Sequence, residues 1–296
     1  MSTFTKFIMF FLRTQLSGWS DGSINEQRTR QEKSIRLFRL PKQIRTRVIE
    51  INGIASEWID SPDSGFGTIL YLHGGAYALG SINSHRELIS RLVISTNCKA
   101  LAINYRLAPE HPFPAALEDS TKAYTWLISS GIDPSRICIA GDSAGGGLAI
   151  ATLLALREKG IPLPAGIFCF SPWLDLTLSG DSIIKNKNLD PILSGSILEK
   201  YVNYYKGNHK ENDPLISPLF ADLRGLPPIL LQSGRNEILL DDSVRFYEKA
   251  RKVGVDVTLK IWDDMFHVFQ LFSFLPETQE SMKQVSEFVS RVMHVE

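Results

Sequence analysis

Eight short apolar runs, separated by segments with helical spacing, most restrict what this chain can fold into. Most of the runs lack the polar alternation of a strand with one solvated face, and such runs are typical of strands buried in a parallel sheet. The pair Asn52-Gly53 joins the first two runs and predicts a β-hairpin at an antiparallel edge. The eight predicted strands are 45–51, 54–60, 68–74, 99–105, 136–141, 165–172, 227–234 and 257–264.

Helical segments lie between these strands and after the last of them, which predicts an α/β fold. We expect a mostly parallel eight-stranded sheet with helices on both faces. The predicted helices cover 84–96, a segment ending near 129, 145–159, 239–253 and 278–294.

Two segments, 1–44 and 174–212, interrupt this alternation. The second contains Tyr201, Tyr204 and Tyr205, and these aromatic side chains favour packing over a disordered loop. We therefore predict that both segments form a helical cap over one end of the sheet. The catalytic core then comprises 45–173 and 213–296.

Charge and cysteine content limit the partners and the compartment. The 32 basic and 32 acidic residues cancel, so no excess of positive charge indicates nucleic-acid binding. The apolar stretch 7–12 is too short for a secretion signal or for a membrane span of about 20 residues, and it predicts an amphipathic helix without stable membrane insertion. Cys98, Cys138 and Cys169 are odd in number and two lie in strand-like runs, which favours buried free thiols and a cytoplasmic location.

The motif Gly-Asp-Ser-Ala-Gly at 141–145 follows a predicted strand and precedes a predicted helix. This context matches a turn that presents a serine nucleophile, with glycines where side chains would collide and the helix N-terminus facing the serine. The other interpretation is a tight turn that happens to contain serine. We favour Ser143 as the nucleophile, with Asp142 in a structural role.

The sequence His-Gly-Gly-Ala at 73–76 follows the third strand. It matches the loop whose backbone N–H groups bind the oxyanion in lipases and esterases. Gly74, Gly75 and Ala144 are the predicted oxyanion donors, and each such donor contributes about 3 kcal/mol to the transition state. His73 is expected to orient the loop rather than to act as a base.

A serine on such a turn needs a histidine and an acid later in the chain. In the α/β-hydrolase layout the order is serine, acid, histidine, with the histidine in the loop after the last strand. Of the six histidines only His267 meets this requirement. Glu237, three residues beyond the strand that ends at Gly234, is the preferred acid, and Asp241 is the alternative.

Five segments together resemble the hormone-sensitive-lipase-like esterases of the α/β-hydrolase superfamily, over about residues 50–290. They are HGGAY at 73–77, YRLAPEHPFPAALED at 105–119, GDSAGGGLA at 141–149, DPLISPL at 213–219, and EILLDDS at 237–243 with a later histidine. The resemblance implies hydrolysis of carboxylic esters or lactones, a lid built from the two extra segments, and a homodimer formed through the edge strand near 257–264. The serine mechanism requires an acyl-serine intermediate and no metal or cofactor. A cap over the site favours short- to medium-chain acyl groups.

One departure concerns the acid. Many members of this family carry an aspartate where this chain has Glu237, so either the glutamate replaces it or Asp241 is recruited. Two other functions remain open. One is a receptor-like homologue that binds a ligand with weak or no catalysis, and the other is an amidase with the same triad.

Overall fold

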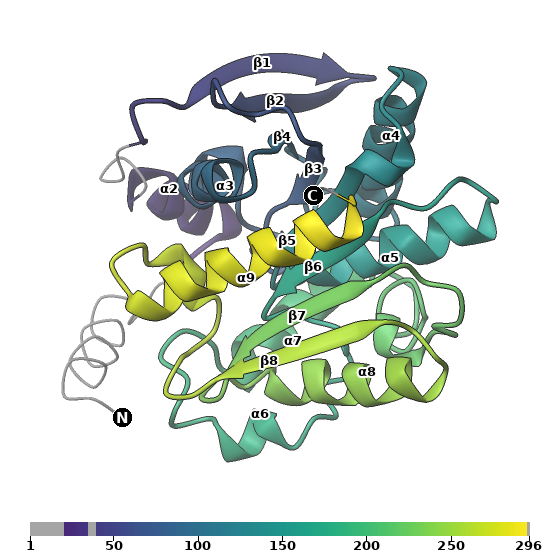
Figure 1. Cartoon of the computed structure of the whole chain (residues 1–296). Helices are drawn as coiled ribbons and strands as arrows, with labels where there is room; N and C mark the ends of the chain where they lie inside the picture. Colours follow the sequence, from purple (N-terminus) through teal and green to yellow (C-terminus); the bar gives the residue numbers. More distant parts are fainter. Residues whose placement is uncertain (1–20, 35–39, 295–296) are drawn as a thin grey trace.

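The computed structural model describes residues 21–34 and 40–294, and within them the eight predicted strands form one sheet (Figure 1). The strand order is β1-β2-β4-β3-β5-β6-β7-β8. β1, β2 and β4 pair antiparallel, and every other neighbouring pair is parallel. The strands are β1 (Arg45–Ile51), β2 (Ile54–Asp60), β3 (Thr68–Leu72), β4 (Lys99–Ile103), β5 (Ile137–Asp142), β6 (Gly166–Phe170), β7 (Ile229–Gly234) and β8 (Val257–Trp262).

Five helices of the described residues lie where helical spacing predicts them, within two residues at each predicted boundary, and three more lie in the two segments predicted to form a cap. They are α2 (Ile24–Ser34), α3 (Ile82–Thr96), α4 (Ala115–Ser129), α5 (Ala144–Glu158), α6 (Ser182–Lys185), α7 (Gly195–Tyr205), α8 (Leu240–Lys252) and α9 (Pro276–Val292). Short 3₁₀ turns are η2 (Pro134–Arg136), η3 (Pro218–Phe220) and η4 (Phe269–Leu271).

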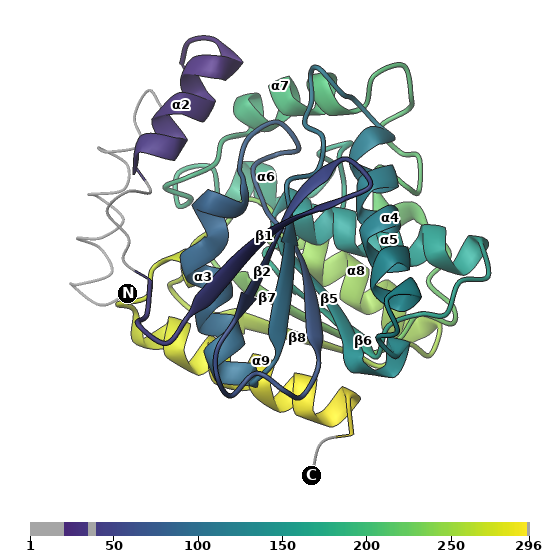
Figure 2. The ribbon, with the colours of Figure 1, turned by 90° about the horizontal axis from the view of Figure 1, so that it is seen from above.

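Helices cover both faces of the sheet, with α3 and α9 on one face and α4, α5 and α8 on the other (Figure 2). Alternate residues of each central strand enter the two cores because successive side chains point to opposite faces. In β3, Ile69 and Tyr71 pack with α3 and α9, whereas Leu70 and Leu72 pack on the α4–α5 side. Apolar side chains at successive positions of β3 therefore have a helix to pack against on either face.

The strand order reverses at the centre of the sheet, because β4 lies on one side of β3 and β5 lies on the other. β3 and β5 are neighbours, with Leu72 paired to Gly141. The chain leaves β3 towards α3 on one face and leaves β5 towards α5 on the other. Such a switch point opens a crevice beyond the carboxyl ends of the two strands, where ligands bind in open α/β sheets.

Two helices outside the regular alternation, α2 and α7, lie over the loops that follow β3 and β4. The Arg28 guanidinium on α2 donates to the carbonyl oxygens of Ala78 (2.8 Å) and Ala108 (2.8 Å). The Tyr201 hydroxyl on α7 donates to Gln27 of α2 (2.6 Å), and Figure 2 shows both helices on the same side of the molecule. The predicted helix at 7–12 lies outside the described residues. No helix in the described part of the chain is long and apolar enough to cross a bilayer.

Candidate active site

Ser143 occupies the turn between β5 and α5. Its backbone angles, φ 53° and ψ −123°, place a non-glycine residue in a region that costs about 1–3 kcal/mol. Its N–H donates to the Phe170 carbonyl (2.8 Å) and its own carbonyl accepts from the Trp173 N–H (3.0 Å). Neighbouring strands and loops therefore hold the serine in this strained conformation at the end of β5.

The glycines around Ser143 are required by close backbone contacts, as the sequence predicts. A Cβ atom on Gly141 would lie 2.4 Å from the Gly145 carbonyl oxygen. One on Gly145 would lie 2.0 Å from the Leu72 carbonyl oxygen. Neither position has room for a side chain, because the atoms it would meet belong to the backbone.

His267 lies in the loop after β8, and its Nε2 is 2.9 Å from the Ser143 hydroxyl oxygen. The imidazole is almost fully buried. Burial works against the charged ring, but the carboxylate of Glu237, with smaller contributions from Asp190 and Asp142, raises the pKa of His267 above its ordinary value. The sequence-predicted serine and histidine are thus brought to hydrogen-bond distance.

Glu237 lies in the turn before α8 and is fully buried. Its Oε2 accepts from the Ser171 hydroxyl (2.7 Å) and the Gly234 N–H (2.8 Å), while its Oε1 lies 3.9 Å from His267 Nδ1. The alternative acid, Asp241, is on α8 and accepts from the Ser182 N–H (2.9 Å). The structure therefore places Glu237 beside the imidazole and uses Asp241 to anchor α6.

The loop after β3 turns sharply, with positive φ at Gly75 (121°), Ala76 (53°) and Tyr77 (60°). The Gly74 N–H donates to Asp142 Oδ1 (3.0 Å), so this predicted oxyanion donor is already occupied. The N–H groups of Gly75 and Ala144 donate to no protein acceptor within residues 21–34 and 40–294. These two are the predicted donors that remain available.

Asp142 holds this loop in place from beside the nucleophile. Its carboxylate accepts from the Tyr71 hydroxyl (2.8 Å) and lies 3.2 Å from His85 Nε2, in addition to its bond to Gly74. Burial opposes the charge of Asp142, but His85 and the Tyr71 hydrogen bond keep its pKa below its ordinary value. Burial likewise opposes charge on His85, yet Asp142 raises its pKa. The structural role expected for Asp142 is thus an anchor for the loop.

His73 stacks on Tyr105 with ring centroids 4.3 Å apart, and the Tyr105 hydroxyl donates to the His73 carbonyl (2.7 Å). Burial, with a smaller contribution from His85, lowers the pKa of His73 to about 3, so the ring is neutral. A neutral, packed ring at this position fits the loop-orienting role expected from the sequence.

Ser171 is a site residue that the sequence interpretation missed. Its hydroxyl donates to Glu237 Oε2 and accepts from the Val268 N–H (3.0 Å), so it links the acid loop to the histidine loop. It sits just after β6 with a φ of 47°. A serine following a buried strand is too common for its position alone to mark it.

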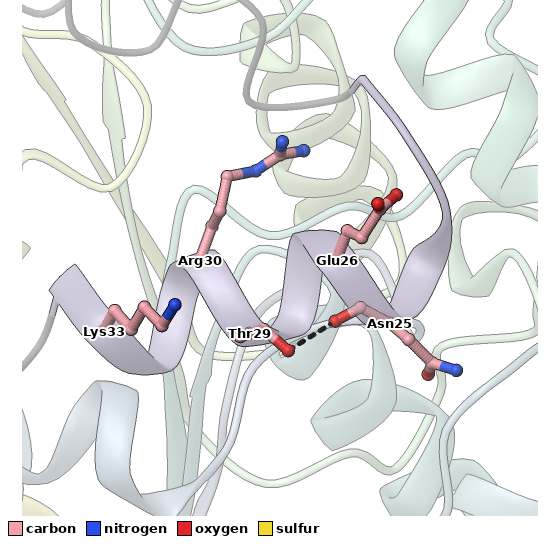
Figure 3. A pocket seen from close by; sticks show the side chains of 5 residues that line it. All are labelled: Asn25, Glu26, Thr29, Arg30 and Lys33. Atoms are coloured by element: carbon pink, nitrogen blue, oxygen red, sulfur yellow. Dashed lines mark hydrogen bonds between the residues drawn. The ribbon is translucent and has the colours of Figure 1, made fainter.

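We also searched the described residues for a metal site and for surface hollows away from Ser143. No group of three or more histidine, cysteine and acidic side chains within them could hold a metal ion. A surface hollow on α2 is shown in Figure 3, where the Thr29 hydroxyl donates to the Asn25 carbonyl (2.8 Å). It is lined by Asn25, Glu26, Thr29, Arg30 and Lys33, all from α2, and contains none of the predicted site residues.

A family model described as the alpha/beta hydrolase fold matches residues 69–271. An acetyl-hydrolase of Streptomyces hygroscopicus is 42% identical over 243 residues, which is 82% of this chain and 81% of that protein. The crystal structure of an esterase from the bacterial hormone-sensitive lipase family superposes with a TM-score of 0.95 at 40% identity, covering 99% of both chains. A crystal of EstE5 soaked with p-nitrophenyl butyrate gives 0.94 at 39% identity, covering 100% of both.

These matches extend over most of the chain and include the strands and loops that carry Ser143, Glu237 and His267. They agree with the sheet order and with the resemblance found in the sequence motifs. The chain belongs to the α/β-hydrolase fold family, and within it to the bacterial hormone-sensitive-lipase-like esterases.

Proposed function

We propose that this esterase hydrolyses carboxylic esters through an acyl-serine intermediate, with Ser143, His267 and Glu237 as its triad. The 2.9 Å contact between Ser143 Oγ and His267 Nε2 carries the proposal. The strained backbone at Ser143 lowers the stability of the fold, and strain of this kind clusters at active sites. A serine hydroxyl presented to a buried imidazole is the arrangement of a serine hydrolase.

The chemistry follows from the placement of these groups. His267 takes the hydroxyl proton while Ser143 Oγ bonds to the ester carbonyl carbon, and the carbonyl oxygen becomes an oxyanion. The free N–H groups of Gly75 and Ala144 stabilise that oxyanion, and Glu237 stabilises the imidazolium. The C–O bond to the alcohol then breaks, and the leaving oxygen takes the proton from His267. Water repeats the sequence at the acyl-serine and releases the acid.

Short- to medium-chain acyl esters or lactones are the proposed substrates. A relative of this chain is named an acetyl-hydrolase, and a structural neighbour was soaked with p-nitrophenyl butyrate. The proposed cap comprises α2, α6 and α7, which are parts of segments 1–44 and 174–212, and we expect it to limit the length of the acyl chain. Tyr205 of α7 stacks on Tyr77 of the loop after β3, with ring centroids 3.6 Å apart.

Labelling with a fluorophosphonate tests the mechanism directly. We expect one phosphonyl group per chain, placed on Ser143 by peptide mass spectrometry, and no label on Ser143→Ala. Hydrolysis of p-nitrophenyl butyrate should disappear in the same variant. Folded wild-type protein that neither reacts with the reagent nor hydrolyses esters would support the receptor-like alternative. Matched ester and amide substrates distinguish an esterase from an amidase, and we expect faster turnover of the ester.

We also propose that the chain forms a homodimer through β8. This strand pairs with β7 on one side, and no strand of the described residues pairs with its other side. An uncovered edge of this kind is a template for pairing with a second copy. Sedimentation equilibrium should give twice the monomer mass of 33.2 kDa, and a monomer at micromolar concentration would contradict it. The cytoplasmic location remains a prediction from the cysteine content.

A further inference from the structure

Six hydrogen bonds join residues 182–190 of the proposed cap to the loop that carries Glu237 and to Asp241 at the start of α8. Asn186 Nδ2 donates to two carbonyl oxygens of this loop, those of Arg235 (3.0 Å) and Glu237 (2.8 Å). The other four are Ser182 Oγ to the Ile238 carbonyl (2.7 Å), the Asp241 N–H to Ser182 Oγ (3.0 Å), the Ser182 N–H to Asp241 Oδ2 (2.9 Å), and the Ile238 N–H to Asp190 Oδ2 (2.9 Å). The cap thus contacts the backbone of the acid loop at Arg235, Glu237 and Ile238.

Asp190 is the one carboxylate of this segment that is buried against the acid loop. Its Oδ1 accepts from the N–H groups of Ile192 (2.8 Å) and Leu193 (3.0 Å), and its Oδ2 accepts from Ile238 (2.9 Å). Ile238 directly follows Glu237 in the chain, so the contact fixes the backbone next to the proposed acid. An asparagine here would present an amide N–H to one of these three N–H donors.

A second consequence is electrostatic. The charged or titratable groups that act on His267 are Glu237, Asp190 and Asp142, all of them buried acids. Burial raises the pKa of Asp190, and His267 and the three backbone N–H donors oppose that rise. The neighbouring pair Arg235–Asp263 is solvent-exposed, and its charges are screened by water.

We propose that Asp190 is a positioning residue for the triad, which fixes the backbone of the Glu237 loop from the cap and so holds the acid opposite His267. The inference rests on the proposed function, because it assigns Asp190 a role through Glu237 and His267. The imidazolium exists mainly in and around the transition state. Asp190 should therefore act on kcat more than on KM.

The test compares Asp190→Asn with Asp181→Asn, using p-nitrophenyl butyrate from pH 5 to 9. Asp181 directly precedes this segment, but it is exposed and forms an ion pair with Lys185. We expect kcat of Asp190→Asn to fall about 10- to 100-fold with little change in KM, as for a small displacement of a catalytic group. The acid limb of its rate profile should move to lower pH, because a displaced Glu237 carboxylate raises the pKa of His267 less strongly. Asp181→Asn should match the wild type.

A second variant, Asn186→Ala, removes two hydrogen bonds to the acid loop and leaves the charge of Asp190 in place. We expect a several-fold fall in kcat and a smaller shift of the acid limb in the same direction, and this arm holds even if Asp190→Asn does not fold. Wild-type kcat in both variants, or a loss in Asp190→Asn without the shift of the acid limb, would overturn the proposal. Fluorophosphonate labelling of the wild type separates this result from a failure of the serine mechanism itself.

Discussion

His267 Nδ1 and Glu237 Oε1 face each other across 3.9 Å, and neither atom has a hydrogen-bond partner within the described residues. The second carboxylate oxygen is fixed by Ser171 and Gly234, so the acid is held slightly back from the ring. Catalytic hydrogen bonds are often long without substrate and shorten when charge develops. Proton uptake by the imidazole should draw the two groups into a charge-assisted bond of about 2.7–2.9 Å.

Replacing the acid should distinguish Glu237 from Asp241. We expect Glu237→Gln to lower kcat by about 10⁴-fold, because the neutral amide neither fixes the tautomer nor stabilises the imidazolium. Asp241→Asn should retain most activity, since Asp241 bonds to Ser182 rather than to the imidazole. Steady-state kinetics of both variants measures this. A larger loss in Asp241→Asn would reassign the acid.

The acid limb of the pH profile should lie above the ordinary histidine value. Neutral His267 is the active form, and its pKa is raised by Glu237, so kcat/KM should fall as the pH drops through a midpoint above about 6.5. The same raised pKa makes the protonated ring favour the folded state, so its contribution to stability is present at low pH and is lost as the pH rises through the folded-state pKa. A midpoint at or below 6.5 would contradict the proposed pairing.

Asp142 should contribute to both stability and turnover. Asp142→Ala leaves the Tyr71 hydroxyl, the Gly74 N–H and the His85 ring without their buried acceptor. Breaking a buried charge pair in this way should lower the free energy of unfolding by about 3–5 kcal/mol. Urea unfolding measures it, with Asp63→Ala as the control, because Asp63 is exposed. A loss below about 1 kcal/mol would show that Asp142 does not anchor the loop.

Gly145 should tolerate no side chain. In Gly145→Ala the new Cβ would meet the Leu72 carbonyl oxygen at 2.0 Å, so β3 and the turn must separate. We expect loss of activity and a lower melting temperature. Gly65→Ala is the matched control, because nothing lies within 4 Å of its Cβ position and its φ is not positive. Equal behaviour of the two variants would refute the close-contact argument.

Acyl chain length should separate substrates clearly. The stack of Tyr205 on Tyr77 places α7 against the loop beside Ser143, so a long acyl chain must displace part of the proposed cap. We expect kcat/KM for p-nitrophenyl acetate or butyrate to exceed that for the palmitate by at least about tenfold, or roughly 1.4 kcal/mol. The comparison is made in detergent-free buffer below substrate aggregation. A preference for palmitate would show that the cap leaves an open acyl channel.

Much of the fold could be predicted because strands that are buried on both faces have consecutive apolar residues. The runs around Ile69 and Ile139 are apolar at successive positions because helices pack on both faces of the sheet. The serine turn could also be predicted, because close backbone contacts at Gly141 and Gly145 leave room only for glycine.

The supporting contacts could not be predicted in the same way. Ser171 and Asp190 act through hydrogen bonds between segments far apart in the chain, and neither has a local pattern that separates it from any other polar loop residue. The hydrogen bond from the Gly74 N–H to Asp142 could not be predicted either, because the motif around Gly74 predicts that its N–H binds the oxyanion. Such contacts depend on how loops meet in three dimensions.

The pairing of β3 with β5, and the arrival of the histidine loop after β8, also bear on when this protein can become reactive. Gly75, Ser143 and His267 are brought together only by contacts between distant parts of the chain, and such contacts form late in folding. When Ser143 has emerged from the ribosome but β8 has not, no histidine lies beside the serine hydroxyl. The growing polypeptide therefore lacks a reactive serine, which forms only when nearly the whole chain has folded.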